Sequence, residues 1–288
     1  MSKNPFVVIA GPCVIEDEGL TLEIAQELKK QLADFPVELY FKASFDKANR
    51  SSVDSYRGPG VTQGLKTLNK VKNQQGHMIL SDVHLPDQIN KVVEVVDFLQ
   101  IPAFLCRQTD LVVAAAEACL RSKKKLNIKK GQFLAPWDAK NIVGKVKSVE
   151  AKFNRNSNLN DWFYITERGS CFGYNQLMVD MSSFQVINQF DTPVIYDATH
   201  SVQMPGAAMG GKTTGGKREV LEVLARAAMA AGANGLFLEC HPNPDKAKSD
   251  GPNAFYLEHV GEFVKQCLAI RNFVSEMPKL LPESKNLK

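Results

Sequence analysis

The sequence predicts a single (β/α)8 barrel, of the TIM barrel class, and two observations support this prediction. Eight short segments rich in apolar or β-branched residues recur along the chain, with helical patterns between most of them. Such alternation is typical of a parallel sheet. The chain has 288 residues and is 44% hydrophobic, enough for one barrel of roughly 250 residues. We therefore expect one domain over residues 1–288, with a core of about 6–271 and a mobile tail over 278–288.

The eight expected strands are short runs of the residue types that favour extended backbone. In chain order they are Phe6–Ala10, Glu38–Lys42, Met78–Val83, Asp97–Pro102, Leu126–Lys129, Trp162–Arg168, Pro193–Thr199 and Gly235–Glu239. The clearest helices between them are Leu20–Leu32, Pro86–Val96 and Glu219–Ala231, which place apolar residues on one face. Gly232 directly after the last of these favours the end of a helix.

Each expected strand ends at or near a polar or reactive side chain. The carboxyl ends of barrel strands meet at one mouth, where barrel enzymes have their active sites. A single polar residue at a strand end is ordinarily just solvated, but eight such ends at one mouth favour a functional site. The side chains concerned are Cys13, Lys42, Asp82 with His84, Gln100, Lys129, Arg168, His200 and Glu239.

Segment Phe41–Ser52 follows the second expected strand and is rich in groups that bind anions. It contains two amines, a guanidinium, an amide and three hydroxyls. Arginine binds phosphate or carboxylate in a bidentate fork, and lysine acts as a point charge. With Arg107, Lys129 and Arg168 at other strand ends, the mouth would hold more positive charge than one phosphate needs. This favours substrates with two phosphates and a carboxylate; the alternative for the segment alone is a generic basic loop.

Four potential metal ligands, Cys13, His200, Glu239 and Asp250, lie far apart in the chain, so their spacing carries no motif. In a closed barrel, however, the first, seventh and eighth strands are neighbours. A thiolate, an imidazole and two carboxylates would suit one divalent zinc, iron(II) or manganese ion. The alternative for Cys13 is a buried packing residue, and His241 is a second candidate ligand.

Composition argues against several other classes of protein. The net charge is only +4 without a long basic block, which gives no support for nucleic-acid binding. No apolar run approaches the roughly 18 residues of a membrane span, and the first residues do not resemble a signal peptide. The six cysteines form no CxxC pair, so we expect reduced thiols in a cytoplasmic protein. Cys240 follows Glu239 directly and is expected to pack outside the barrel mouth, because successive strand side chains point to opposite faces. The remaining cysteines are expected to be packing residues: Cys106, Cys119, Cys171 and Cys267.

Segment Gly206–Thr213 matches the P-loop pattern G-x-x-x-x-G-K-[ST]. A P-loop works only when a strand enters it directly and a helix starts at its Lys-Thr pair. Here Pro205 and other loop residues separate the match from the seventh strand, and Gly215 and Gly216 interrupt the helix start. We therefore expect a mobile lid over Gln203–Gly216, with no role assigned to its residues.

Several segments together carry a family resemblance: Lys42–Ser52, Ser55–Gly60, Asp82–His84, Pro102–Leu111, Asn127–Lys130 and Asp250–Pro252. They resemble the signatures of the 3-deoxy-D-manno-octulosonate 8-phosphate synthases, over roughly residues 6–271. The resemblance implies a barrel enzyme, usually a homotetramer, that condenses phosphoenolpyruvate with D-arabinose 5-phosphate and water. The products would be 3-deoxy-D-manno-octulosonate 8-phosphate and phosphate, for lipopolysaccharide biosynthesis.

The resemblance also implies roles for individual residues. The phosphoenolpyruvate site would comprise Lys42, Ser44, Lys47, Gln100, Lys129 and Arg168. The arabinose 5-phosphate site would comprise Asn49, Arg50 and Ser51, with Asp82 and His84 as further substrate-binding residues. Arg107 would reach the sugar phosphate of a neighbouring subunit.

In this family the residue after Gly-Pro in the first strand's loop is asparagine in metal-independent members and cysteine in metal-dependent ones. The segment Gly11-Pro12-Cys13 therefore implies a metal held by Cys13, His200, Glu239 and Asp250. The catalytic residues we expect are Lys42, Lys47, Lys129 and Asp250, with either Asp250 or a metal-bound water as the candidate base. The metal would either polarise the aldehyde or activate water.

Three alternatives remain open at this stage. The first is the sister enzyme, 3-deoxy-arabino-heptulosonate 7-phosphate synthase, which uses erythrose 4-phosphate; the run Lys47–Ser52 argues against it because that family carries a different tetrapeptide there. The second is a Schiff-base aldolase that uses Lys42 or Lys129. The third is a non-catalytic protein that binds a sugar phosphate.

Overall fold

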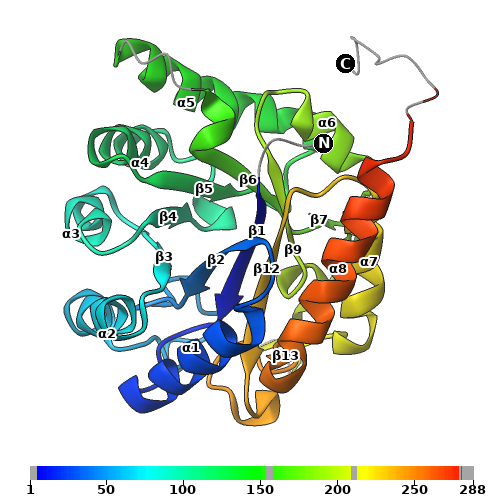
Figure 1. The fold of residues 1–288 in the computed structure, drawn as a ribbon. Helices are drawn as coiled ribbons and strands as arrows, with labels where there is room; N and C mark the ends of the chain where they lie inside the picture. The colour runs from blue at the N-terminus through cyan, green and yellow to red at the C-terminus, as the bar shows by residue number, and fades with distance from the viewer. Residues whose placement is uncertain (1–4, 154–157, 209–212, 279, 281–288) are drawn as a thin grey trace.

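The computed structural model describes residues 5–153, 158–208, 213–278 and 280. Eight parallel strands lie at the centre and close into a barrel, because β12 pairs with β1 as well as with β9 (Figure 1). The strands are β1 Phe6–Gly11, β2 Val37–Lys42, β3 Met78–Asp82, β4 Phe98–Ile101, β5 Lys125–Lys129, β6 Phe163–Glu167, β9 Val194–Asp197 and β12 Gly235–His241. These are the eight strands expected from the sequence, and the predicted (β/α)8 barrel is confirmed.

Helices surround the strands and form the outer layer of the molecule. They are α1 Glu18–Leu32, α2 Gly60–Gln75, α3 Ile89–Val93, α4 Thr109–Ser122, α5 Ala139–Lys152, α6 Ser183–Asn188, α7 Leu221–Ala230 and α8 Val260–Ser275. Helix α1 begins two residues before the expected start because the Asp17 side chain caps it, accepting a hydrogen bond from the Leu20 amide at 2.8 Å. The predicted mobile tail falls largely on residues 279 and 281–288, which lie outside the described residues.

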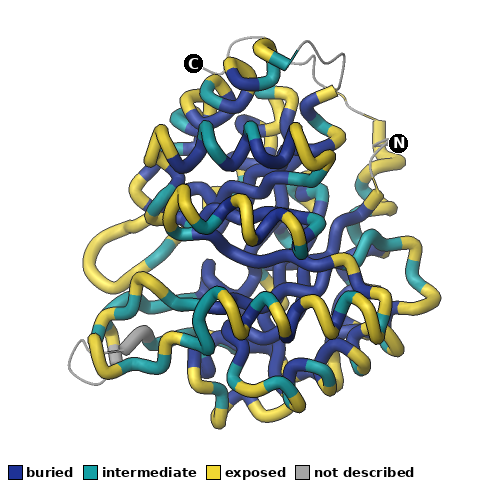
Figure 2. The backbone as a smooth tube through the Cα atoms, turned by 90° about the vertical axis from the view of Figure 1, so that its left-hand side faces the viewer, coloured by how far each residue is buried: buried dark blue, intermediate teal, exposed yellow. Residues whose placement is uncertain are grey.

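Strand residues alternate between two buried layers. On β1, Val7 and Ile9 belong to a cluster inside the barrel, whereas Val8 and Ala10 pack outwards against the helices. Buried backbone accordingly runs through the centre of the molecule, and exposed segments lie on outer helix turns and loops (Figure 2). Both faces of the sheet are thus covered by apolar side chains, which leaves the strand ends for polar groups.

The amino end of the barrel is closed by an aromatic and ionic layer. The Phe98 ring lies between Tyr40 and Tyr164, with centroid distances of 4.9 and 5.2 Å. Lys125 donates to both carboxylate oxygens of Glu38 at 2.7 Å, and its Nζ lies 5.4 Å from each tyrosine ring centroid. This layer fills the interior at one end, so the cavity described below opens at the other.

Small additional strands lie in the loops at the carboxyl ends. Hairpin β7–β8 comprises Ser170–Cys171 and Leu177–Met178, hairpin β10–β11 comprises Gln203–Ala208 and Thr213–Gly216, and β13 Phe255–Tyr256 pairs with the end of β12. The described parts of the P-loop match belong to β10 and β11 and to no helix, in agreement with its rejection. None of the helices in the described ranges is long and apolar enough to cross a membrane.

One cysteine does not pack as expected. Cys106, Cys119, Cys240 and Cys267 are buried as predicted, but Cys171 is exposed. It belongs to hairpin β7–β8, which follows β6 as a separate two-stranded sheet. The sequence reveals no such excursion, so the prediction for this thiol was wrong.

We predict that Phe98→Ala lowers the free energy of unfolding by about 3–5 kcal/mol, because the cavity it leaves is enclosed by Tyr40 and Tyr164. Urea unfolding followed by circular dichroism measures the change. The matched control is Phe273→Ala on α8, where the side chain is 66% exposed and a change within about 0.5 kcal/mol is expected. Equal losses in the two variants would contradict the assignment of Phe98 to the barrel interior.

Candidate active site

A cavity of about 610 Å³ opens at the carboxyl ends of the barrel strands. Among its described lining residues are six Lys and Arg side chains and three carboxylates, so its surface is rich in opposite charges with an excess of cations. Most site residues expected from the sequence line it: Lys42, Lys47, Asn49, Arg50, Ser51, Asp82, His84, Gln100, Lys129, Arg168, His200, Glu239 and Asp250.

Three expected site residues do not line this cavity. Cys13 lies directly behind its wall, where its Sγ is 3.1 Å from Asp250 Oδ2. Ser44 is fully buried and donates to Asp82 at 2.6 Å. Arg107 is exposed between β4 and α4, and its backbone carbonyl accepts from Lys145, so within this one chain it takes no part in the cavity.

A chain of side-chain hydrogen bonds crosses five neighbouring strand ends at the floor of the cavity. It runs through Ser44, Asp82, Gln100, Asn127 and Thr166. Gln100, which was expected to bind phosphoenolpyruvate, donates to Asp82 and accepts from Asn127. Its carboxamide therefore ties β3 to β5 and retains one N–H for a ligand.

The acidic member of this chain stays ionised. Burial by itself would raise the pKa of Asp82, but the charges of Lys42 and Lys47 outweigh burial and hold the pKa well below its usual range. The same balance acts on Glu239, where burial is outweighed by Lys42 and His200 and the pKa is again low. The carboxylates of the cavity therefore keep their charge at neutral pH and compensate the lysines.

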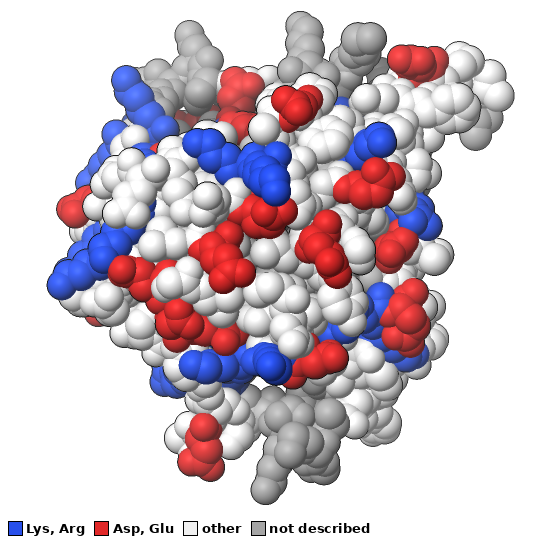
Figure 3. Space-filling view, turned by 60° about the horizontal axis from the view of Figure 1, so that its bottom comes forward, with Lys and Arg blue, Asp and Glu red and all other residues white. Residues whose placement is uncertain are grey.

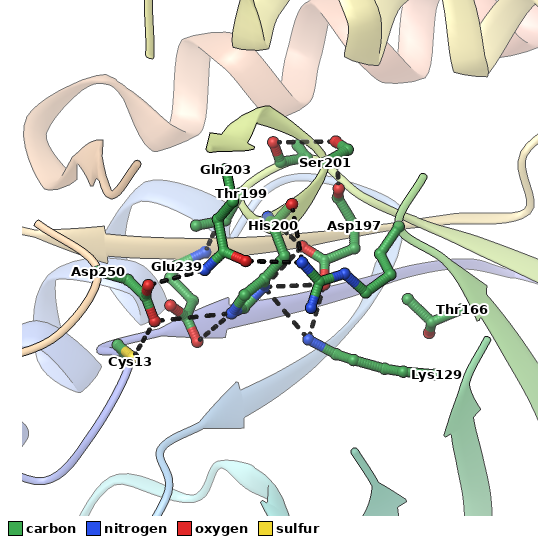
Figure 4. Close-up of polar contacts among 12 residues, drawn as sticks. Cys13, Lys129, Thr166, Asp197, Thr199, His200, Ser201, Gln203, Glu239 and Asp250 are labelled. Carbon is green, nitrogen blue, oxygen red and sulfur yellow. Dashed lines mark hydrogen bonds and ion pairs between the residues drawn. The ribbon is translucent and has the colours of Figure 1, made fainter. Parts of the chain in front are cut away.

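The expected metal ligands come together at one side of the cavity (Figure 4). Ligand atoms of Cys13, Glu239 and Asp250 all lie within 4.8 Å of one another. His200 Nε2 lies 3.7 Å from Glu239 Oε1 and 3.9 Å from Asp250 Oδ2. Asp250 reaches the cluster with a φ of 51°, a left-handed conformation that is uncommon for residues other than glycine.

Close packing of β1 on β2 brings Cys13 to this cluster. At Gly11, with φ of 153°, an added Cβ would lie 2.1 Å from the backbone oxygen of Lys42. Only glycine lets the two backbones approach this closely. Cys13 then follows two residues later, beside Glu239 and Asp250.

These residues fit a divalent metal ion. Glu239 Oε2 is buried and has no hydrogen-bond partner among the described residues. Burial raises the pKa of the Cys13 thiol, and Glu239 raises it further, so a thiolate here needs an additional positive charge. A divalent ion supplies that charge, and a sulfur, nitrogen and oxygen donor set suits zinc, iron(II) or manganese.

The second candidate ligand, His241, points elsewhere. Its Nδ1 accepts from the Asn243 amide at 2.9 Å, and its Nε2 lies 3.7 Å from Glu16. The described cluster of Cys13, Glu239 and Asp250 includes neither histidine, but His200 Nε2 lies within 3.9 Å of two of its members.

Sequence reasoning missed Asp197, which is fully buried at the end of β9. Its carboxylate lies 2.9 and 3.0 Å from His200 Nδ1 and accepts from Lys129 Nζ at 2.7 Å. Because a carboxylate only accepts, His200 carries a proton on Nδ1, and its Nε2 faces Glu239 and Asp250. The available signal was an acidic residue at the end of an expected strand, three residues before His200.

Cationic groups of the cavity have unused hydrogen-bond donors. Arg168 Nε and Arg50 Nη2 are buried without a partner among the described residues. Lys42 donates to Glu239 at 2.6 Å and to the Cys13 carbonyl at 2.8 Å. Buried cationic N–H groups without partners are suited to bind a phosphate or carboxylate.

We predict that Asp197→Asn weakens binding of a divalent metal by about ten- to a hundredfold, because an amide can donate to His200 Nδ1 and favour the wrong tautomer. Competition with a chromophoric chelator measures the affinity. The control is Asp97→Asn, since Asp97 pairs with Lys72 and Lys124 before β4, at the amino end of the barrel. Unchanged affinity in the Asp197 variant would contradict this role.

Acidification tests the depressed pKa of Asp82. Its contribution to stability is complete above the ordinary carboxyl pKa of 3.8 and is lost as the pH falls below that value towards the lower native pKa. Between about pH 6 and about pH 3, the wild type should lose more unfolding free energy than Asp82→Asn, by on the order of 1 kcal/mol. Urea unfolding at both pH values measures this, and the exposed Asp87→Asn variant should follow the wild type.

Comparison with known proteins agrees with this geometry. The family model described as the DAHP synthetase I family matches residues 2–274. A protein of Desulfatibacillum aliphaticivorans named 2-dehydro-3-deoxyphosphooctonate aldolase is 52% identical, with 94% of each chain covered. Proteins of the same name from Citrifermentans bemidjiense and Desulfotalea psychrophila are 49% and 47% identical, covering 95% and 96% of this chain and 94% and 93% of theirs. The chain therefore belongs to the DAHP synthetase I family, among its 2-dehydro-3-deoxyphosphooctonate aldolases.

Proposed function

We propose that this protein condenses phosphoenolpyruvate with D-arabinose 5-phosphate and water to give 3-deoxy-D-manno-octulosonate 8-phosphate and phosphate. The observation that carries the proposal is one cavity that combines many cationic side chains with a Cys, Glu and Asp cluster. The name of the relatives, 2-dehydro-3-deoxyphosphooctonate aldolase, refers to the same product chemistry. The pathway we propose is lipopolysaccharide biosynthesis, in the cytoplasm.

Two groups of residues in the cavity provide for two anionic substrates. Lys42, Lys47, Lys129 and Arg168 would hold phosphoenolpyruvate beside the metal cluster, with Ser44 and Gln100 shaping the floor. Asn49, Arg50 and Ser51 would bind the sugar phosphate from the loop after β2, and Asp82 and His84 would be further substrate-binding residues. Separate cationic groups keep two phosphates apart while their reacting carbons meet.

The reaction requires stabilisation of anionic charge more than covalent help from the protein. The enol carbon of phosphoenolpyruvate attacks the aldehyde carbon, water adds at the second carbon, and the carbon–oxygen bond to phosphate then breaks. Lys42, Lys129 and Arg168 would stabilise the charge that develops around the enol. A divalent ion held by Cys13, His200, Glu239 and Asp250 would supply Lewis acidity when bound.

Asp250 is our candidate for the general base. Burial would raise the pKa of its carboxyl, but His200 opposes this, and the pKa lies below its usual value. The carboxylate is therefore ionised at neutral pH and able to accept a proton within the cavity.

The alternatives account less well for these features. The heptulosonate synthase shares the family model, but the relatives near half identity carry the octonate name. A Schiff-base aldolase needs a neutral lysine. Lys42 is ion-paired with Glu239, and Lys129, whose pKa burial lowers, is ion-paired with Asp197. A non-catalytic sugar-phosphate binder gives no reason for a buried thiol beside two carboxylates.

We also propose a homotetramer. Large apolar side chains are exposed on the loops that follow the neighbouring strands β4, β5 and β6, namely Phe104, Phe133, Trp137, Phe172 and Tyr174. Exposed apolar groups gathered at one rim favour a contact between proteins. Arg107 lies after β4 on the same rim, where it would reach the sugar phosphate of a neighbouring subunit.

Neither nucleic acid nor a membrane is among the partners we propose. Acidic and basic side chains are interspersed on the face that Figure 3 shows, without gathering into one region of one sign. The net charge of +4 agrees with this distribution.

The organisation as one domain over residues 1–288 also stays a prediction.

We predict that the protein releases phosphate from phosphoenolpyruvate in the presence of arabinose 5-phosphate, and much more slowly with erythrose 4-phosphate. Chelation should abolish the release, and zinc, iron(II) or manganese should restore it, because Cys13, Glu239 and Asp250 form a site that fits a divalent ion. A colorimetric phosphate assay with both sugars, before and after chelation, measures this.

Cys13→Ala is the matched variant for the metal, and added metal should not restore its activity. Activity of this variant that survives exhaustive chelation would remove the metal from the proposal. A preference for erythrose 4-phosphate would transfer the protein to the heptulosonate synthases. Borohydride trapping of a substrate on Lys42 or Lys129 would favour the Schiff-base aldolase, and substrate binding without phosphate release would favour a binding protein.

A further inference from the structure

We infer that Gln203 is a positioning residue whose neutral carboxamide holds Arg168 and Asp250 apart and fixes the orientation of both. The inference rests on the proposed function, because that function assigns Arg168 to the anionic substrate and Asp250 to the metal. Nothing in the sequence indicated a role for Gln203, which belongs to the segment expected as a lid.

The side chain of Gln203 forms a bridge between these two charged groups. Its Oε1 accepts from Arg168 Nη2 at 2.6 Å, and its Nε2 donates to Asp250 Oδ1 at 2.7 Å. Figure 4 shows the amide directed at Asp250, above His200 and Glu239. A guanidinium only donates and a carboxylate only accepts, so this is the one orientation of the amide that satisfies both.

A neutral residue at this point has an electrostatic consequence. Arg168 and Asp250 carry opposite charges and are both largely buried, with Arg168 6% exposed and the Asp250 side chain 14% exposed, so a direct ion pair between them would be strong. Such a pair would occupy the guanidinium that we assign to the substrate and the carboxylate that we assign to the metal. The amide satisfies one atom of each group and transfers no charge to either.

One atom of each group lies outside this bridge and is a candidate for ligand contacts. Arg168 Nε is buried without a partner among the described residues. Asp250 Oδ2 lies 3.1 Å from Cys13 Sγ and 3.9 Å from His200 Nε2. Gln203 thus occupies the one oxygen of Asp250 that does not take part in these cluster contacts.

Strand pairing and close packing hold the backbone of Gln203 in place. Gln203 begins β10 and is paired with Gly216 at the base of the hairpin. An added Cβ at Gly216 would lie 1.9 Å from Asn253 Oδ1, so the hairpin base packs closely on the loop after β12. That loop carries Asp250, whose carbonyl accepts from the Asn253 amide at 2.9 Å.

The test compares Gln203→Met, which keeps the length but removes donor and acceptor, with Gln203→Glu, which neutralises Arg168. Isothermal titration measures phosphoenolpyruvate binding to metal-free protein, and equilibrium dialysis measures Mn²⁺ binding. We expect phosphoenolpyruvate to bind roughly tenfold more weakly to the Met variant and more weakly still to the Glu variant. Binding of Mn²⁺ to the Met variant should weaken as well, while its urea unfolding midpoint stays near that of the wild type.

Asn175→Ala is the control for the position of the hairpin. Asn175 donates to the Pro205 carbonyl on the same strand and is absent from the described lining of the cavity. Both affinities should therefore stay close to the wild type in this variant. Equal losses in the Asn175 and Gln203 variants would overturn the inference, because they would trace the effect to the hairpin position.

Wild-type affinities for phosphoenolpyruvate and Mn²⁺ in both Gln203 variants would also overturn the inference, whether or not the enzyme turns over. A wild type that binds both ligands yet releases no phosphate would instead contradict the proposed function. In that case, weakened binding in the Gln203 variants would still support the role of the amide.

Discussion

The pairing of the last barrel strand with the first is the constraint on which the site depends. β12 lies parallel to β1 with Glu239 opposite Gly11, and this register sets Cys13 beside the carboxylates of Glu239 and Asp250. A shift of β12 by one residue would turn Glu239 towards the helices and bring Cys240 inside. Barrel closure therefore brings the candidate metal ligands together, and the absence of a side chain at Gly11 lets β1 pass close to Lys42.

The second constraint is the burial of many charges in one place. An unpaired buried charge is costly, so each ion at the mouth needs a partner. Glu239 lies 2.6 Å from Lys42 and 3.8 Å from Lys47, and Asp197 accepts from Lys129. The compensation is incomplete at a few buried atoms, such as Glu239 Oε2. Opposite charges in the site thus largely compensate one another, while Glu239 Oε2 and Arg168 Nε keep no hydrogen-bond partner among the described residues.

Three neutral or acidic residues near these charges each orient a neighbouring side chain. Asp197 determines which nitrogen of His200 carries the proton, and Gln203 keeps Arg168 from pairing with Asp250. Gln100 has a similar effect at the floor of the cavity, where its side chain on β4 donates to Asp82 on the neighbouring strand β3. Each of these residues acts on another side chain, which explains why the chemistry of its own functional group gave little indication of its role.

Apolar periodicity in the sequence alone determined the barrel, because alternation of buried strands and amphipathic helices admits few other folds. Strand ends then identified most of the cavity lining, since parallel strands direct their carboxyl ends to one mouth. Tertiary structure alone decided the contacts of Cys13, Asp197 and Gln203, which depend on strand register and on the path of a hairpin. It also placed Arg107 outside the cavity of its own chain. Hydrogen bonds between residues distant in sequence require angstrom-scale placement, and no local pattern of residues encodes such distances.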